Sequence, residues 1–194
     1  MPLEIIRYPH PTLRHTSKTI KRVDAELRRI VREMFDRMYE AQGVGLAANQ
    51  VGLPLRLFVV NLEGQPGAGE ELVFLNPVIS MPRGSSESEE GCLSLPGLYG
   101  PVVRPKQVRI SAYNLSGEEF RGDLNGLFAR VVQHELDHLD GVLFTDRMSE
   151  EALEERREKL LEFERDYETA RQAGQLPSIE ENAAHLAEWE SRYC

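Results

Sequence analysis

The chain has 194 residues, of which 41% are hydrophobic and 28% are charged, and its formal net charge is -9. This length suits one domain with a substantial core and leaves room for an appendage. The negative net charge argues against a general nucleic-acid-binding protein, because phosphate groups would repel it. We therefore expect no direct nucleic-acid partner.

The N-terminal segment, the longest apolar run and the cysteines indicate the cellular compartment. The opening segment "MPLEIIRYPHPTLRHTS" has no uninterrupted apolar core of signal-peptide length. The most apolar run, "LPLRLFVVNL", is interrupted by Arg56 and is too short to span a bilayer. The two cysteines, Cys92 and Cys194, provide no disulfide framework, which is typical of a reducing compartment. These features predict a cytoplasmic protein without a membrane partner.

The first predicted element is a helix that Asp24 can cap. Its apolar face is formed by residues at helical spacing, namely Leu27, Ile30, Val31, Met34 and Met38. We expect it to end at the glycine-rich segment "QGVGLAANQVG".

Four runs then have the composition of strands: "LRLFVVNL", "ELVFLNPVIS", "QVRISAYNL" and "EEFRGDL". They are separated by the turn-forming segments "EGQPGAGE", "MPRGSSES" and "NLSGE". The Ser116-Gly117 dipeptide predicts a hairpin between the last two strands. A helical segment follows the strands, so that strands and helices are segregated along the chain and an α+β fold is expected.

That helical segment contains "VVQHELDHLDGVLF", in which His134, Glu135 and His138 form the pattern H-E-x-x-H. Residues four apart project from one face of a helix, so the two imidazoles can bind a single ion. Glu135 lies about 100° further around the helix, where it can reach a water on that ion without being a ligand. Gly141 provides a left-handed stop. The alternative is a buried helix that carries these three residues by coincidence.

Acidity is concentrated in residues 148–194, which hold 13 acidic and 6 basic side chains. We therefore expect a catalytic domain over 1–147 and an acidic helical extension over 148–194. Residues 149–172 are predicted to form one amphipathic helix that ends at Gly174 and Pro177, with a narrow apolar stripe made of Leu153, Leu160, Leu161 and Phe163. Such a helix is either solvated or self-associating, so a monomer and a dimer joined through the tail both remain open.

A third metal ligand must come from elsewhere in the chain. Phe144 occupies the position at which a metzincin protease has its third histidine, and the other histidines lie in segments without evident site chemistry. Cys92, in "ESEEGCLSLPG", is one candidate, although a lone cysteine is most often a buried, inert residue. A thiolate and two imidazoles form a suitable set with one open position for water. Glu89 and Glu90 are alternatives with harder oxygen ligands.

Three segments in order resemble the signature segments of bacterial peptide deformylases: "GVGLAANQVG" at 43–52, "EGCLSLPG" at 90–97 and "QHELDHLDG" at 133–141. The opening "YPHPTLR" is also similar to the start of that family. The resemblance spans about residues 3–147 and does not cover the tail. It implies antiparallel sheets packed around the HExxH helix. It also implies a metal-dependent hydrolase of protein biosynthesis that removes the formyl group from the N-terminal formylmethionine of newly made polypeptides and releases formate.

The resemblance further implies roles for individual residues. Cys92, His134 and His138 would hold the metal, and Glu135 would move a proton from the attacking water to the departing amine. The Gln50 amide and the Leu93 backbone N–H would stabilise the oxyanion. The substrate would lie beside five further residues, which are Gly43, Val44, Gly45, Leu127 and Val131. Iron(II) is the metal that the resemblance favours in the cell, with Zn²⁺, Ni²⁺ or Co²⁺ in its place after purification.

Some positions depart from the family pattern or leave a choice open. Arg130 stands where some relatives have an apolar residue, and Tyr99 stands where some have an arginine, which affects the outer wall of the substrate pocket. A carboxylate that orients a ligand histidine is expected at Asp137 or Asp140, with a backbone carbonyl as the alternative.

Two other functions compete with deformylation. A gluzincin-like zinc peptidase would take its third ligand from a later helix, where Glu150, Glu151, Glu154 and Glu155 are available. A binding module without activity could use the same scaffold, although binding alone requires neither Glu135 nor Gln50. The expected partners are N-formylmethionyl nascent peptides near the ribosome. Ribosomal RNA should repel an acidic tail, so we expect little docking through residues 148–194.

Overall fold

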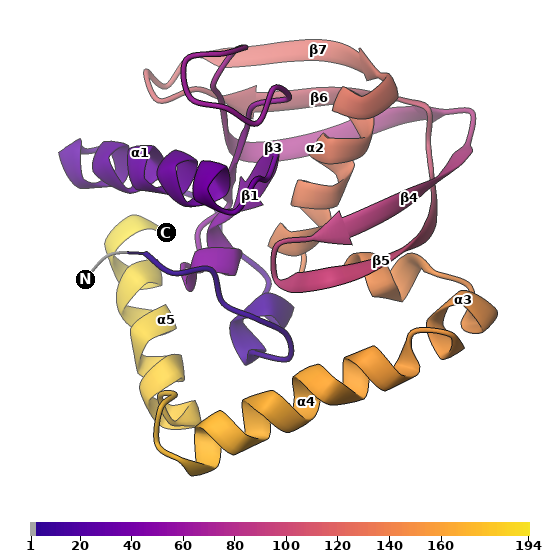
Figure 1. Ribbon diagram of the computed structural model, residues 1–194. Helices are drawn as coiled ribbons and strands as arrows, with labels where there is room; N and C mark the ends of the chain where they lie inside the picture. The colour runs from indigo at the N-terminus through magenta and orange to yellow at the C-terminus, as the bar shows by residue number, and fades with distance from the viewer. Residues whose placement is uncertain (1–2) are drawn as a thin grey trace.

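A computed structural model describes residues 3–194 (Figure 1). The helices are α1 (Ala25–Glu40), α2 (Gly126–Leu139), α3 (Glu150–Glu154), α4 (Arg157–Gln172) and α5 (Ile179–Tyr193). The strands are β1 (Gly45–Ala47), β2 (Leu57–Val60), β3 (Leu72–Arg83), β4 (Ser86–Cys92), β5 (Leu95–Arg104), β6 (Gln107–Tyr113) and β7 (Glu119–Asn125). Three 3-10 turns complete the order, η1 (Pro11–Arg14), η2 (Ala48–Val51) and η3 (Phe144–Arg147).

The strands form two antiparallel sheets. One has five strands in the order β1-β2-β3-β6-β7, and the other is the hairpin of β4 and β5. Helix α2 lies between the larger sheet and the β4–β5 hairpin (Figure 1). The predicted α+β fold, with antiparallel sheets around the HExxH helix and further helices at the C-terminus, is confirmed.

Helix α1 forms as its sequence predicts. The Asp24 carboxylate accepts a hydrogen bond from the backbone N–H of Leu27 at 2.9 Å, which satisfies a group that the first helical turn leaves without a partner. The predicted apolar face is fully buried and packs with residues of β1 and β2 such as Leu46 and Leu57.

Helix α2 has two different faces. Val132 and Leu139 pack against the larger sheet, in a cluster with Phe58 and Phe74. The other face looks toward the β4–β5 hairpin (Figure 1). It carries His134, whose ring lies 3.0 Å from the carboxylate of Glu90 in β4. The helix stops where expected, because Gly141 has a φ of 73°, a left-handed conformation that glycine adopts without steric cost.

The strand predictions were correct for β2, β3, β6 and β7 but missed the other three. The segment "MPRGSSES" is not a connection, because β3 continues to Arg83 and β4 begins at Ser86. Several side chains of β4 are exposed serines and glutamates, so this strand lacks the apolar alternation by which strands are recognised. The segment around Cys92 is therefore the end of a strand followed by a tight turn.

The prediction of one continuous helix over residues 149–172 was wrong, because the structure has two helices there. The chain bends between α3 and α4, around Glu155 and Arg156. Of the predicted apolar stripe, Phe163 is buried, whereas Leu153 and Leu161 are 37% and 43% exposed. Helix α5 was not predicted, although Ser178 and Glu181 form a capping box at its start.

The C-terminal helices fold back along the N-terminal part of the chain (Figure 1). Tyr193 is 1% exposed in the same cluster as α1, and its hydroxyl donates a hydrogen bond to Asp24 at 2.9 Å. Glu190 accepts hydrogen bonds from Lys18 and pairs with His15. The end of the chain is thus part of the hydrophobic core. Within residues 3–194, no helix combines the length and the apolar character that crossing a bilayer requires.

Candidate metal centre

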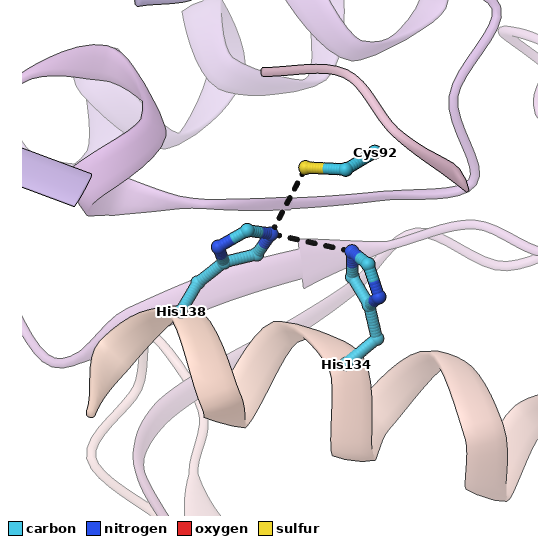
Figure 2. A group of neighbouring side chains, drawn as sticks. All are labelled: Cys92, His134 and His138. Carbon is cyan, nitrogen blue, oxygen red and sulfur yellow. Dashed lines mark hydrogen bonds between the residues drawn. The ribbon is translucent and has the colours of Figure 1, made fainter. Parts of the chain in front are cut away.

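Three potential metal-binding atoms meet between β4 and α2. Cys92 ends β4, whereas His134 and His138 lie one turn apart on α2, and their ligand atoms all fall within 4.8 Å of one another. The His138 Nε2 atom lies 3.3 Å from the Cys92 Sγ atom and 3.2 Å from the His134 Nε2 atom (Figure 2). Two segments more than 40 residues apart in sequence therefore converge on one point.

The hydrogen bonding fits a cation at this point. His134 Nδ1 lies 3.0 Å from a carboxylate oxygen of Glu90, so Nδ1 carries the hydrogen and Nε2 presents a lone pair to the centre. A tetrahedral ion bound at about 2.0–2.3 Å would separate its nitrogen and sulfur ligands by about 3.3–3.6 Å. The observed separations are close to these values, and a thiolate with two imidazoles suits a borderline metal.

A buried ion-pair network supports His134 from behind. Glu90 receives two hydrogen bonds from Arg104, at 2.6 and 2.9 Å, and one from Arg130 at 2.5 Å. Arg104 is 3% exposed and also binds Asp137 at 2.7 Å. Both oxygens of Glu90 are therefore occupied by protein partners, which argues against its role as a metal ligand.

The prediction that Asp137, Asp140 or a backbone carbonyl orients a ligand histidine was wrong. Asp137 pairs with Arg104 and Arg147, and Asp140 pairs with Arg56 at the surface. Glu90 takes that role for His134, which sequence spacing could not indicate because the two residues lie on different elements. Within the described chain, His138 Nδ1 is buried without a hydrogen-bond partner.

The pKa values of the groups around the centre are shifted by burial and by their neighbours. Burial alone would raise the pKa of Glu90, but hydrogen bonds from His134 and Arg104 outweigh it and lower this pKa to about 2. Burial disfavours the charged form of His134, yet Cys92 and Glu90 raise its pKa to about 10 in the metal-free chain. Burial and the neighbouring His134 lower the pKa of His138 well below its usual value. A metal ion would displace the proton that His134 otherwise holds.

Glu135 lies beside the three potential ligands without belonging to the group. Its carboxylate is 4% exposed, and its Oε2 atom has no hydrogen-bond partner in residues 3–194. Burial raises its pKa to about 7. Gly45 makes room for this carboxylate, because a Cβ atom at position 45 would overlap it. Gly43 similarly leaves space for the Leu93 side chain.

Gln50 is fixed in the same site. Its Oε1 atom accepts a hydrogen bond from the Ala47 N–H at 2.9 Å, which orients the amide. Its Nε2 atom then lies 3.2 Å from Ser94 Oγ and 3.4 Å from Cys92 Sγ. The amide thus presents its donor side toward the potential metal ligands.

The centre opens into a cavity of about 650 Å³, within the usual size range of a small-ligand site. The predicted substrate-binding residues all line it, namely Gly43, Val44, Gly45, Leu127 and Val131, together with Gln50, Leu93, Tyr99 and Arg130. One wall is β1, an edge strand of the larger sheet, which an extended peptide can join by backbone hydrogen bonds. Leu127 is 59% exposed at the mouth, where an apolar side chain of a ligand could cover it.

The chain matches known proteins along nearly its whole length. The family model described as polypeptide deformylase matches residues 2–154. A peptide deformylase of Rhodopirellula baltica is 53% identical over 193 residues, which cover 100% of this chain and 96% of the relative. The chain belongs to the polypeptide deformylase family. The match in Rhodopirellula also includes the C-terminal extension.

Solved structures of deformylases have the same fold. The structure of a plant peptide deformylase aligns with a TM-score of 0.86 at 46% sequence identity. The alignment covers 92% of this chain and 96% of the plant chain. The structure of Plasmodium falciparum peptide deformylase has a TM-score of 0.83 at 42% identity, with coverages of 86% and 98%. As a member of this family, the 194-residue chain is a metal-dependent hydrolase that removes the formyl group from an N-terminal formylmethionine.

The gluzincin-like alternative is not supported. The glutamates it requires lie in or next to α3 and are exposed, and among the described residues only Cys92, His134 and His138 form a group that could hold a metal. The binding-module alternative fails because the chain belongs to a family of enzymes.

Proposed function

We propose that Cys92, His134 and His138 hold one divalent metal ion and that Glu135 transfers protons beside it during deformylation. The observation that carries this proposal is the convergence of one sulfur and two ring nitrogens next to a buried carboxylate with an unpartnered oxygen. When bound, the metal supplies a positive charge that polarises the attacking water and the formyl group. We infer that the ion is iron(II) in the cell and that zinc, nickel or cobalt can occupy the same donors after purification.

The residues around this centre have separate tasks. Glu135 accepts a proton from the water that attacks the formyl carbon, and then delivers it to the departing amine, so that formate and a free N-terminus result. The Gln50 amide and the Leu93 backbone N–H stabilise the negative charge on the formyl oxygen. The fixed orientation of Gln50 supports this task, because a donor held in place need not reorganise during the reaction.

We propose that the formylated peptide lies along the open edge of β1. Gly43 and Gly45 would lie beside it, while the space left by their missing side chains is occupied by Leu93 and Glu135. The methionine side chain would occupy the apolar part of the cavity, which Val44, Leu127 and Val131 line. Arg130 is held by Glu90 and by the Val102 carbonyl at 3.0 Å, and therefore forms a fixed polar wall.

Formate release from formyl-Met-Ala-Ser tests the proposed roles. The metal-loaded Glu135→Ala variant should retain its metal but lose at least about 100-fold in kcat/KM, because general acid–base catalysis contributes about that much. Glu89→Ala is a suitable control, because Glu89 lines the same cavity from an exposed position. Activity close to wild type in Glu135→Ala would exclude Glu135 as the proton carrier.

We further propose that residues 1–147 form the catalytic domain, that residues 148–194 form a stabilising extension, and that the enzyme is a cytoplasmic monomer. The buried side chains of the extension, Phe163, Leu186 and Tyr193, pack on their own chain, which leaves less apolar surface for a dimer through the tail. Sedimentation equilibrium should give the mass of one chain. The acidic extension should not dock on ribosomes, and cosedimentation that disappears on deletion of 148–194 would refute this.

A further inference from the structure

A second cavity of about 470 Å³ lies between the N-terminal segment and α4. Two contacts hold its walls together. The Tyr8 hydroxyl donates a hydrogen bond to Glu164 at 2.8 Å, and the His10 ring meets the Tyr167 ring edge-on, with 6.2 Å between centroids. Figure 1 shows α4 running beneath this part of the chain. The second cavity is therefore built by the C-terminal extension and would not exist without it.

The second cavity adjoins the substrate cavity. Ile5, Arg7 and Pro96 line both, so the two cavities lie next to each other along these three residues, which form their shared rim. Cys92, His134 and Glu135 line the first cavity but not the second. A formylated peptide has its formyl group at the metal centre, and nothing precedes that group. Any part of the peptide that crosses the shared rim must therefore be its downstream part.

The lining of the second cavity suits a peptide segment. Its floor is apolar and aromatic, with Ile6, Phe163, Tyr167, Ala170 and Leu176. Five charged side chains also line the cavity, namely the carboxylates of Glu4, Glu162 and Asp166 and the basic groups of Arg7 and Lys159. Glu162 is paired with Lys159 at 2.8 Å, whereas Glu4 and Asp166 have no salt-bridge partner within residues 3–194. Arg7 likewise has no salt-bridge partner within the described residues, so the three acidic and two basic side chains leave the lining with a net charge of -1.

We propose that this second cavity continues the substrate cleft and binds a downstream part of the formylated peptide, with a preference for basic side chains. The proposal rests on the deformylase function described above. Continuity with the substrate cavity identifies the occupant, and the charges of Glu4 and Asp166 determine the preference. The C-terminal extension would thus select among nascent chains by a sequence that lies beyond the three residues nearest the formyl group.

The test compares two formylated octapeptides on the metal-loaded enzyme at low ionic strength. Both begin with formyl-Met-Ala-Ser, and positions 5 to 7 are lysine in one and glutamate in the other. The wild type should prefer the lysine peptide by about two- to fivefold in kcat/KM, as expected for exposed charge pairs. The double variant Glu4→Lys/Asp166→Lys should abolish or reverse this ratio. Because both peptides are measured on the same variant, the ratio of their kcat/KM values cancels any general effect of the substitutions on turnover.

The matched control is Glu70→Lys/Glu188→Lys, which makes the same change in net charge at exposed residues that line neither cavity. It should keep the wild-type ratio. If Glu4→Lys/Asp166→Lys and the control gave the same ratio of kcat/KM for the two octapeptides, the proposal would be overturned. If the wild type released no formate from formyl-Met-Ala-Ser, the proposed function would fail instead, and fluorescence anisotropy of the labelled octapeptides would still measure the ratio as relative affinity.

Discussion

Replacing Glu90 by glutamine tests whether the metal centre depends on the buried charge network. Glu90 is 7% exposed, and its carboxylate binds His134, Arg104 and Arg130. Glutamine has nearly the same shape but no charge, so the two arginines lose their shared anion and His134 loses an anionic acceptor. Two measurable quantities should therefore fall, the free energy of unfolding and the affinity for metal.

The magnitudes follow from the burial of the partners. Breaking a buried ion pair from one side costs about 3–5 kcal/mol. Arg104, which is 3% exposed, keeps Asp137 as a second partner, so we expect a cost near the lower limit, about 3 kcal/mol. For a chain of this length that corresponds to a fall in Tm of about 6–12 °C. Loss of a carboxylate that orients a ligand histidine typically weakens metal binding by about 10–100-fold.

Thermal unfolding of the metal-free protein isolates the effect on stability, and competition with a chelator of known affinity measures metal binding. The matched control is Glu89→Gln, at the neighbouring exposed residue, which should change the free energy of unfolding by no more than about 0.5 kcal/mol. If Glu90→Gln unfolds and binds metal like the control, the network does not support the site and this reasoning is wrong.

Three further predictions concern the glycine beside the Glu135 carboxylate and the C-terminal extension. Gly45→Ala should lower kcat/KM by about 10–100-fold with normal metal content, because the new Cβ displaces Glu135, and unchanged kinetics would contradict this steric role. Tyr193→Ala should cost about 3–5 kcal/mol in urea unfolding, because Tyr193 is 1% exposed in the core, and a loss below about 1 kcal/mol would show that the tail is not part of it. Glu190 has a pKa below its ordinary 4.5, because hydrogen bonds from Lys18 and His15 outweigh its burial. Its stabilisation is therefore complete above pH 4.5 and lost as the pH falls through the lowered pKa. The stability difference between wild type and Glu190→Gln, at most about 1 kcal/mol, should be present at pH 6 and shrink in acid, and a pH-independent difference would refute the assignment.

The sequence predicted the elements whose residues repeat with a clear period. Helix α1 could be recognised because one face of it is apolar, and the four strands because most of their runs are rich in apolar residues, on both faces in the case of β2. The exposed side chains of β4 gave no such period. The bend at Glu155 and Arg156 was also not predictable, because residues at and after it contact distant parts of the chain: Arg156 donates a hydrogen bond to the Tyr99 carbonyl, and Phe163 packs with residues of β5.

The residues of the site could be named from motifs, but their surroundings could not. The pattern of His134 and His138 on one helix predicts two ligands, and the resemblance to deformylases supplied Cys92. The partner of His134 and the steric role of Gly45 depend on packing between separate elements, and so did the role of the extension in forming a second cavity. Local sequence periodicity contains no information about such contacts.

Anaerobic purification followed by metal analysis tests the metal centre most directly. The wild type and the control Cys194→Ala, which removes the other thiol, should each contain about one divalent ion per chain. Cys92→Ala should lose most of it, because a thiolate contributes one of three protein ligands. Full metal content in Cys92→Ala would show that the sulfur is not a ligand and would contradict the proposed centre.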